Sequence, residues 1–168
     1  PNHQLNRKTP LHTRANVAYF GTFGYELDLN KLSDEEISEV KQQITFMKEY
    51  RELIQFGTFY RLKSPFEGNE TVWMTVSEDK KTALVFWYRE RNVVNADFTR
   101  VRLQGLDPDL IYRNEYNETE NYGDELMNLG LLTTDCTAGE PTSEDAPCTD
   151  YESRIYVLTT VARIPSPL

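Results

Sequence analysis

"RELIQFGTFYRLKSPFEGN", residues 51–69, starts as the end of a charged helix and becomes strand, turn and loop within a few residues. Upstream of this switch, apolar side chains recur at intervals of three and four residues, which predicts one apolar stripe on a helix. The stripe contains Ile37, Val40, Ile44, Met47 and either Leu53 or Ile54. Ser33 and Glu36 match a capping box, so we expect the helix to begin directly after Ser33.

Downstream of Gly57 the pattern indicates an antiparallel sheet. Short runs of β-branched and aromatic residues are separated by turn-forming residues. The runs are TFYRLK, TVWMTVS, TALVFWYRE, RVRLQ, LIYRNE and RIYVLTTVA. The stretch ALVFWY, residues 83–88, is apolar at every position, which suits a strand covered on both faces, as two packed sheets would provide. The predicted order is therefore helices first and strands second, an α+β arrangement.

Composition and charge narrow the class of protein. The chain has 168 residues, of which 39% are hydrophobic, and this predicts a folded, soluble protein with a substantial core. No apolar run approaches the length of a membrane span, so we expect no membrane insertion. A net charge of -9 opposes binding to nucleic acid or to anionic lipid. Pro1 stands first and no signal-peptide pattern follows, so we expect a piece of a longer protein.

The two cysteines lie in an acidic segment. Cys136 and Cys148 bracket CTAGEPTSEDAPC, which lacks the cysteine and histidine spacing of zinc sites. They are either two free thiols or one disulfide, and the sequence leaves both alternatives open. Residues 135–152 hold acidic side chains and no basic one, which predicts an exposed loop. Glycosylation-type triplets at Asn69 and Asn117 do not settle the compartment, for which the cytoplasm is slightly favoured over secretion.

The residues alone predict no catalytic, cofactor or metal site. Neither a P-loop nor a Gly-x-Ser-x-Gly motif is present. His3 and His12 are the only histidines and have no suitably spaced third ligand, so we expect no metal and no cofactor. Two facing acids about 5 Å apart would suffice for retaining glycoside hydrolysis. Most acids of this chain, however, fall in the helix start, the turns or the acidic segment, where a solvated surface explains them.

Aromatic side chains offer a possible sugar-binding surface. The flat rings of Trp73, Trp87 and Tyr122 have the shape that stacks on a pyranose. Core packing is the favoured interpretation, because both tryptophans lie inside strand patterns. From the residues alone we therefore predict a helical segment joined to an antiparallel sheet domain, and no reaction.

The sequence contains several long motifs that occur together, and in the same order, in one enzyme family. They are PNHQ, TPLHTR with NVAYFGTFGYELDL, RELIQFGTFYRLKSPFEGN, GLDPD and YGDELMNLGL. With these motifs the chain resembles the C-terminal part of alpha-galactosidases of glycoside hydrolase family thirty-six. The resemblance runs from Pro1 to about Leu131 and resumes at YESRIYVL, residues 151–158. The acidic segment between the cysteines looks longer than the family's usual loop.

The resemblance implies a three-part parent protein: an N-terminal β-rich domain, a central (β/α)8 barrel and a C-terminal antiparallel β-sandwich. Residues 1–56 would form the end of the barrel and residues 57–168 the sandwich. Asn2 and His3 would border the sugar site, because PNHQ would follow the last barrel strand, where such sites are built. The parent would form a homo-oligomer, a tetramer in many members of the family.

The chemistry implied by the resemblance lies outside this chain. The family hydrolyses terminal alpha-galactosyl residues by a retaining mechanism with one aspartate as nucleophile and another as acid/base. The nucleophile sits in a Lys-x-Asp motif, which is absent here, so we expect no catalytic residue in this chain. Two other functions stay open: a stand-alone carbohydrate-binding sandwich, and a protein-interaction module without sugar affinity. The barrel-like start, PNHQ followed by TPLHTR, favours the enzyme part.

Overall fold

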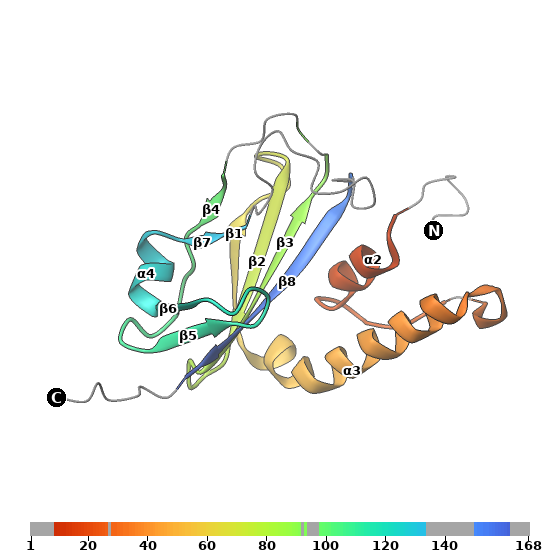
Figure 1. The fold of residues 1–168 in the computed structure, drawn as a ribbon, viewed down its shortest axis with the longest axis horizontal. Coiled ribbons are helices and arrows are strands. Elements are labelled where there is room, and N and C mark those ends of the chain that lie inside the picture. The colour runs from red at the N-terminus through yellow and green to blue at the C-terminus, as the bar shows by residue number, and fades with distance from the viewer. Residues whose placement is uncertain (1–8, 27, 92, 94–97, 134–149, 162–168) are drawn as a thin grey trace.

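The computed structural model describes residues 9–161 apart from residues 27, 92, 94–97 and 134–149 (Figure 1). The helices are α2 (Leu11–Ala18), α3 (Asp34–Phe56) and α4 (Gly123–Asn128), and a 3-10 turn covers Leu29–Lys31. The strands are β1 (Thr58–Lys63), β2 (Glu70–Val76), β3 (Thr82–Arg89), β4 (Arg100–Val101), β5 (Ile111–Asn114), β6 (Glu120–Tyr122), β7 (Leu131–Leu132) and β8 (Glu152–Thr160). The predicted order, helices first and then strands, is confirmed.

Helix α3 begins where its capping box predicts. Ser33 Oγ accepts a hydrogen bond from the Glu36 N–H at 3.2 Å, and Glu36 Oε2 accepts one from the Ser33 N–H at 2.9 Å. Two amide donors that the helix itself leaves unpaired are thus satisfied. The acidic residues of the first turn also face the positive end of the helix dipole.

The buried face of α3 differs in part from the predicted stripe. Val40 and Met47 are buried, as predicted, whereas Ile37 and Ile44 are only half-buried. Gln43 is buried in their place, at 7% exposure. A polar side chain can be buried at this position because both ends of its amide group are hydrogen-bonded, the oxygen to Tyr25 and the nitrogen to Glu39. The stripe is therefore rotated toward Gln43 relative to the prediction.

The junction from helix to sheet is tight. Gly57 caps α3 with a hydrogen bond from its N–H to the Leu53 carbonyl at 2.9 Å, and β1 begins at the next residue. A side chain at Gly57 would place its Cβ 2.5 Å from that carbonyl oxygen and 2.6 Å from Thr75 Oγ1. The Thr75 hydroxyl in turn donates to the Leu53 carbonyl at 3.1 Å. The end of α3 is therefore held directly against β2.

The strands form an antiparallel sheet with the order β1-β2-β3-β8-β5-β6, beside a two-stranded sheet of β4 and β7. The first three strands are joined by short connections along the chain. Strand β8 returns from the end of the chain to pair with the whole of β3, and then with β5 at residues 158–160. The centre of the sheet is thus made by strands that are distant in sequence.

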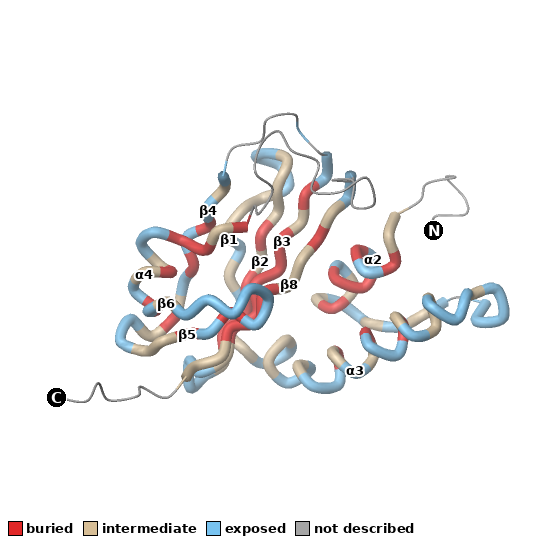
Figure 2. Tube along the Cα trace, viewed as in Figure 1, coloured by how far each residue is buried: buried red, intermediate tan, exposed pale blue. Residues whose placement is uncertain are grey.

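Both faces of the six-stranded sheet are covered. On β3, alternate side chains such as Val85 and Trp87 enter one core, while Leu84 and Phe86 enter another. The first core is shared with β4, β7 and α4, through Val101, Leu131 and Leu126. The second is shared with α2 and α3, through Ala15, Tyr19 and Met47. Figure 2 shows the buried residues running through β2, β3 and β8.

The prediction that ALVFWY lies in a doubly covered strand is confirmed, and the structure adds what covers it. A second sheet element covers one face, and the helices cover the other (Figure 1). The helices and the sheet are therefore in contact through a common core. Within the described residues, no helix is both long enough and apolar enough to cross a membrane.

Candidate functional site

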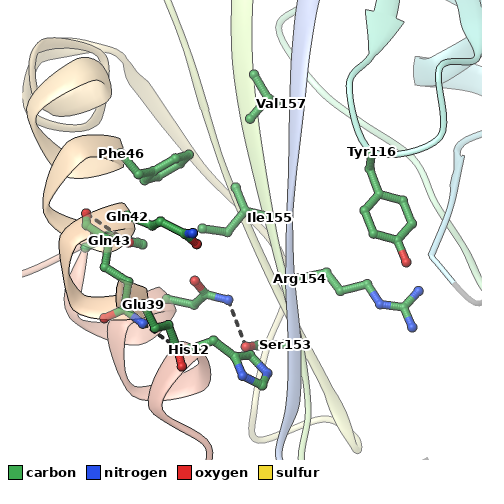
Figure 3. A pocket seen from close by; sticks show the side chains of 12 residues that line it. His12, Glu39, Gln42, Gln43, Phe46, Tyr116, Ser153, Arg154, Ile155 and Val157 are labelled. Atoms are coloured by element: carbon green, nitrogen blue, oxygen red, sulfur yellow. Dashed lines mark hydrogen bonds between the residues drawn. The ribbon is translucent and has the colours of Figure 1, made fainter. Parts of the chain in front are cut away.

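A groove of about 420 Å³ lies between the two N-terminal helices and β8 (Figure 3). Its lining is more apolar than polar and comes from four segments: α2, α3, β8 and the turn after β5. The lining residues are His12, Asn16, Tyr19, Glu39, Gln42, Gln43, Phe46, Tyr116, Ser153, Arg154, Ile155 and Val157. In Figure 3 the side chains of α3 lie on one side of β8, and Tyr116 and Arg154 lie on the other. The groove therefore extends across the edge of the strand.

A chain of hydrogen bonds fixes α2 to the sheet at the floor of the groove. Asn16 Nδ2 donates to Ser153 Oγ at 2.9 Å, and Ser153 Oγ donates to Thr13 Oγ1 at 3.0 Å. Thr13 Oγ1 donates to the Tyr151 carbonyl at 2.8 Å, and the Tyr88 hydroxyl donates to the Asn16 carbonyl at 2.6 Å. Buried polar groups stabilise a structure only when they are paired in this way. The network thus gives α2 one defined position on the sheet.

A second polar cluster lies under the opposite wall of the groove. Tyr19 OH donates to the Gln43 carbonyl at 3.2 Å, and Tyr25 OH donates to Gln43 Oε1 at 2.5 Å. Gln43 Nε2 donates to Glu39 Oε1 at 2.7 Å. Burial raises the pKa of Tyr19 well above its ordinary value, and the negative charge of Glu39 adds to the effect. Burial raises the pKa of Tyr25 in the same way. Both phenols are therefore hydrogen-bond donors that stay protonated.

Alkaline pH is expected to destabilise the fold through its buried tyrosines. Burial raises the pKa of Tyr88 and Tyr19 far above 10.0 and the pKa of Tyr50 to about 12. In the unfolded chain these phenols lose their protons near pH 10, whereas the folded chain retains them. The folded state then binds more protons, so stability is fully present below about pH 10 and falls as the pH rises above it.

Urea unfolding at a series of pH values from about 9 to 11.5 measures this effect. Tyr88→Phe is the matched variant, because it removes one titrating group and keeps the ring. We expect its midpoint to fall less steeply with pH than that of the unsubstituted chain. Identical slopes for the two proteins would contradict the assignment of this loss to Tyr88.

The opposite face of the sheet holds a compact cationic cluster around Trp87. Arg89 forms an ion pair with Glu152 Oε2, and Arg154 Nη2 lies 2.5 Å from Glu152 Oε1. The two guanidinium carbons lie 5.4 and 5.6 Å from the centre of the Trp87 ring. Trp87 itself is 1% exposed. The ring is enclosed by core residues and cations, so its interpretation as a core residue is confirmed.

The other two aromatic candidates differ in exposure. Trp73 is half-buried and packs edge-on against Phe20 and Tyr88, with ring centres 5.4 and 5.5 Å away. It belongs to the aromatic layer between the sheet and the helices. Tyr122 remains 40% exposed in β6. The three rings therefore do not form a common sugar-binding platform, because Trp87 is enclosed in the core on the far side of the sheet from Trp73.

Asn2 and His3, the predicted rim of the sugar site, lie outside the described residues, as do Cys136 and Cys148. Their predicted roles stay predictions. His12 lies in the groove wall. Within the described residues, no group of three or more His, Cys, Asp and Glu side chains is placed to hold a metal ion.

Sequence reasoning missed Gln43 and Tyr116 as groove residues. Gln43 carried a usable signal, since it lies between Val40 and Met47 on the same side of the helix. Tyr116 carried none, because its position depends on how the turn after β5 meets β8. The groove joins residues that are up to 145 positions apart, from His12 to Val157.

Comparison with known proteins places both halves of the chain in one enzyme family. Residues 1–57 match the Melibiase family model, and residues 70–158 match the Glycosyl hydrolase family 36 C-terminal domain. Alpha-galactosidase AgaA of Geobacillus stearothermophilus is 50% identical over 131 residues, which are 78% of this chain and 18% of that protein. Alpha-galactosidase Mel36A of Lactobacillus acidophilus is 45% identical over the same shares of the two chains.

Solved structures agree with these matches. The crystal structure of AgaA superposes with a TM-score of 0.83 at 43% identity, covering 96% of this chain and 21% of that one. An alpha-galactosidase from Lactobacillus brevis gives a TM-score of 0.84 at 41% identity, covering 97% of this chain and 22% of that one. The chain thus spans about a fifth of the length of the relatives it matches. It belongs to glycosyl hydrolase family 36 and corresponds to the C-terminal portion of that family's alpha-galactosidases.

Proposed function

We propose that this chain is the non-catalytic C-terminal part of an enzyme that releases terminal alpha-galactosyl residues from oligosaccharides. The observation that carries the proposal is the match to alpha-galactosidases along the chain, at 50% identity for AgaA. A retaining mechanism needs two carboxylates on opposite sides of the scissile bond. Among the described residues, the half-buried carboxylate of Glu152 pairs with both Arg89 and Arg154, which is a structural task. The reacting carboxylates would therefore come from the upstream barrel.

Within the proposed enzyme, residues 1–56 form the end of the barrel and residues 57–168 the sandwich. The end of α3 at Phe56 and the start of β1 at Thr58 support this division. The Melibiase match ends at residue 57, and the match to the C-terminal domain begins at residue 70. Asn2 and His3 precede α2 and would reach the rim of the sugar site from the barrel side.

Alpha-galactosides of the raffinose type are the proposed substrates. Variants of AgaA have been crystallised in complexes with raffinose and stachyose. The proposed assembly is a homo-oligomer, with a tetramer as the first state to test.

Release of nitrophenol from p-nitrophenyl alpha-galactoside tests the proposal directly. The 168-residue chain alone should release none, and the same chain joined to its upstream part should turn the substrate over. Circular dichroism of the isolated chain serves as the control that it is folded. Activity in the isolated chain would overturn the proposal, because the reacting carboxylates would then lie within these residues.

A further inference from the structure

Strand β8 has one edge that is only half paired. Its full length pairs with β3, but among the described residues β5 pairs only with Leu158, Thr159 and Thr160 on the other edge. The next hydrogen bond on that edge runs from the Glu115 N–H to the Val157 carbonyl at 2.9 Å. At Tyr116 the chain leaves β5 for a turn, and from there to the start of β8 no strand among the described residues pairs with this edge.

The direction of the backbone groups along this edge follows from the observed bonds. The Thr160 N–H donates to the Lys81 carbonyl at the end of β3, whereas the Val157 carbonyl faces β5. Peptide groups alternate between the two sides of a strand, so even-numbered residues of β8 face β3 and odd-numbered ones face the other edge. Ser153 and Ile155 therefore direct their N–H and C=O groups away from β3. No described residue pairs with them there.

These backbone groups lie in the groove between the helices and Tyr116. Ser153 is only 6% exposed, and Ile155 is half-buried. Backbone groups shielded from bulk water cost free energy unless they are paired, and an open strand edge recruits another strand. The apolar walls include Phe46, Ile155 and Val157, which suit alternate side chains of an added strand (Figure 3). The unpaired backbone groups and the apolar walls of the groove thus both fit an extended polypeptide.

We propose that an extended segment of the same protein, from the part that precedes Pro1, adds to the edge of β8 at Ser153 and Ile155. The inference rests on the proposed function, in which this chain is the end of a longer enzyme. The relatives are about five times as long as this chain, which covers 21% of the AgaA chain. The Melibiase match includes α2 and α3, so in the proposed enzyme the helices that form the groove wall are the end of the barrel. A tethered segment reaches the edge at a high effective concentration.

Hydrogen exchange of the full-length protein, resolved to single amides, tests whether an added segment pairs with the edge of β8. The strand contains its own controls, since the N–H groups of Arg154 and Tyr156 face β3 and should be protected in any case. We expect Ser153 and Ile155 to exchange as slowly as these two neighbours, on the order of 100-fold slower than exposed amides or more. Fast exchange at Ser153 and Ile155 beside slow exchange at Arg154 and Tyr156 would overturn the proposal.

A pair of substitutions in the full-length protein provides a second test. Ile155→Pro removes the outward N–H and fills its place with the ring, whereas Ile155→Ala removes the apolar side chain and keeps the N–H. A proline is tolerated at an unpaired edge but not inside a ladder. We expect Ile155→Pro to melt several degrees below Ile155→Ala, and equal melting temperatures would contradict the proposal.

Nitrophenol release by the unsubstituted full-length protein separates the two proposals. An active enzyme with unprotected Ser153 and Ile155 would refute only the added strand. A protein that is inactive but protects both amides would refute the proposed function and keep the added strand.

Discussion

Replacing Trp87 with alanine is expected to lower the free energy of unfolding by about 3–5 kcal/mol. Trp87 is 1% exposed in the core between the large sheet and α4. Its ring also lies against Arg89 and Arg154, and both of these guanidinium groups pair with Glu152. The truncation therefore leaves a large cavity and exposes two guanidinium groups to it. Both effects destabilise the folded state.

Urea unfolding followed by circular dichroism measures this loss. Phe66→Ala is the matched control, since Phe66 is an aromatic residue with 95% exposure. Its truncation should change the stability by no more than about 0.5 kcal/mol. If the two variants lost the same stability, Trp87 would not be a core residue, and the interpretation of β3 as a doubly covered strand would be wrong.

Replacing Met47 with aspartate is expected to cost about 3–5 kcal/mol and to separate α3 from the sheet. Met47 is 6% exposed and packs with Leu84 and Phe86 in the core that the helices share with the sheet. An aspartate there would be a buried charge, and the lost methionine would leave a cavity. The same substitution at Ile44 should cost less, because Ile44 is half-buried.

Lys48→Asp is the control for the helix itself. Lys48 is exposed and adjacent to Met47, so the two variants share the added carboxylate and the same position along α3. Chemical denaturation should show a nearly unchanged midpoint for Lys48→Asp and a much lower one for Met47→Asp. Equal losses would mean that helix propensity, rather than the contact with the sheet, determines the stability of α3.

Local features of the fold could be predicted from the sequence because their causes are local. The capping box of Ser33 and Glu36 needs only residues three positions apart, and α3 begins as predicted. The continuous apolar run 83–88 indicated burial on both faces, and β3 has it. The pairing of β3 with β8 has no such local cause, since it joins residues 82–89 to residues 152–159. Nothing in either segment alone specifies that register.

The groove could not be predicted for the same reason. Its floor depends on the bond between Asn16 and Ser153, which are 137 positions apart. The polarity of Gln43 suggests a surface residue although its spacing places it on the same side of the helix as Val40 and Met47, and its hydrogen-bond partners in the folded chain allow its burial. The family resemblance supplied the enzyme class and the barrel-and-sandwich architecture, which composition and periodicity do not contain.

The shared core of helices and sheet limits where this protein can be divided. A chain that began at Gly57 would retain every strand but would expose Leu84, Phe86 and Val157, which α2 and α3 now cover. The exposed apolar face would favour aggregation, so the sandwich is not a portable module. Fusion proteins and domain exchanges within the family should therefore transfer the last barrel helices and the sandwich together. A break point before α2 should preserve solubility, and one at the apparent boundary should not.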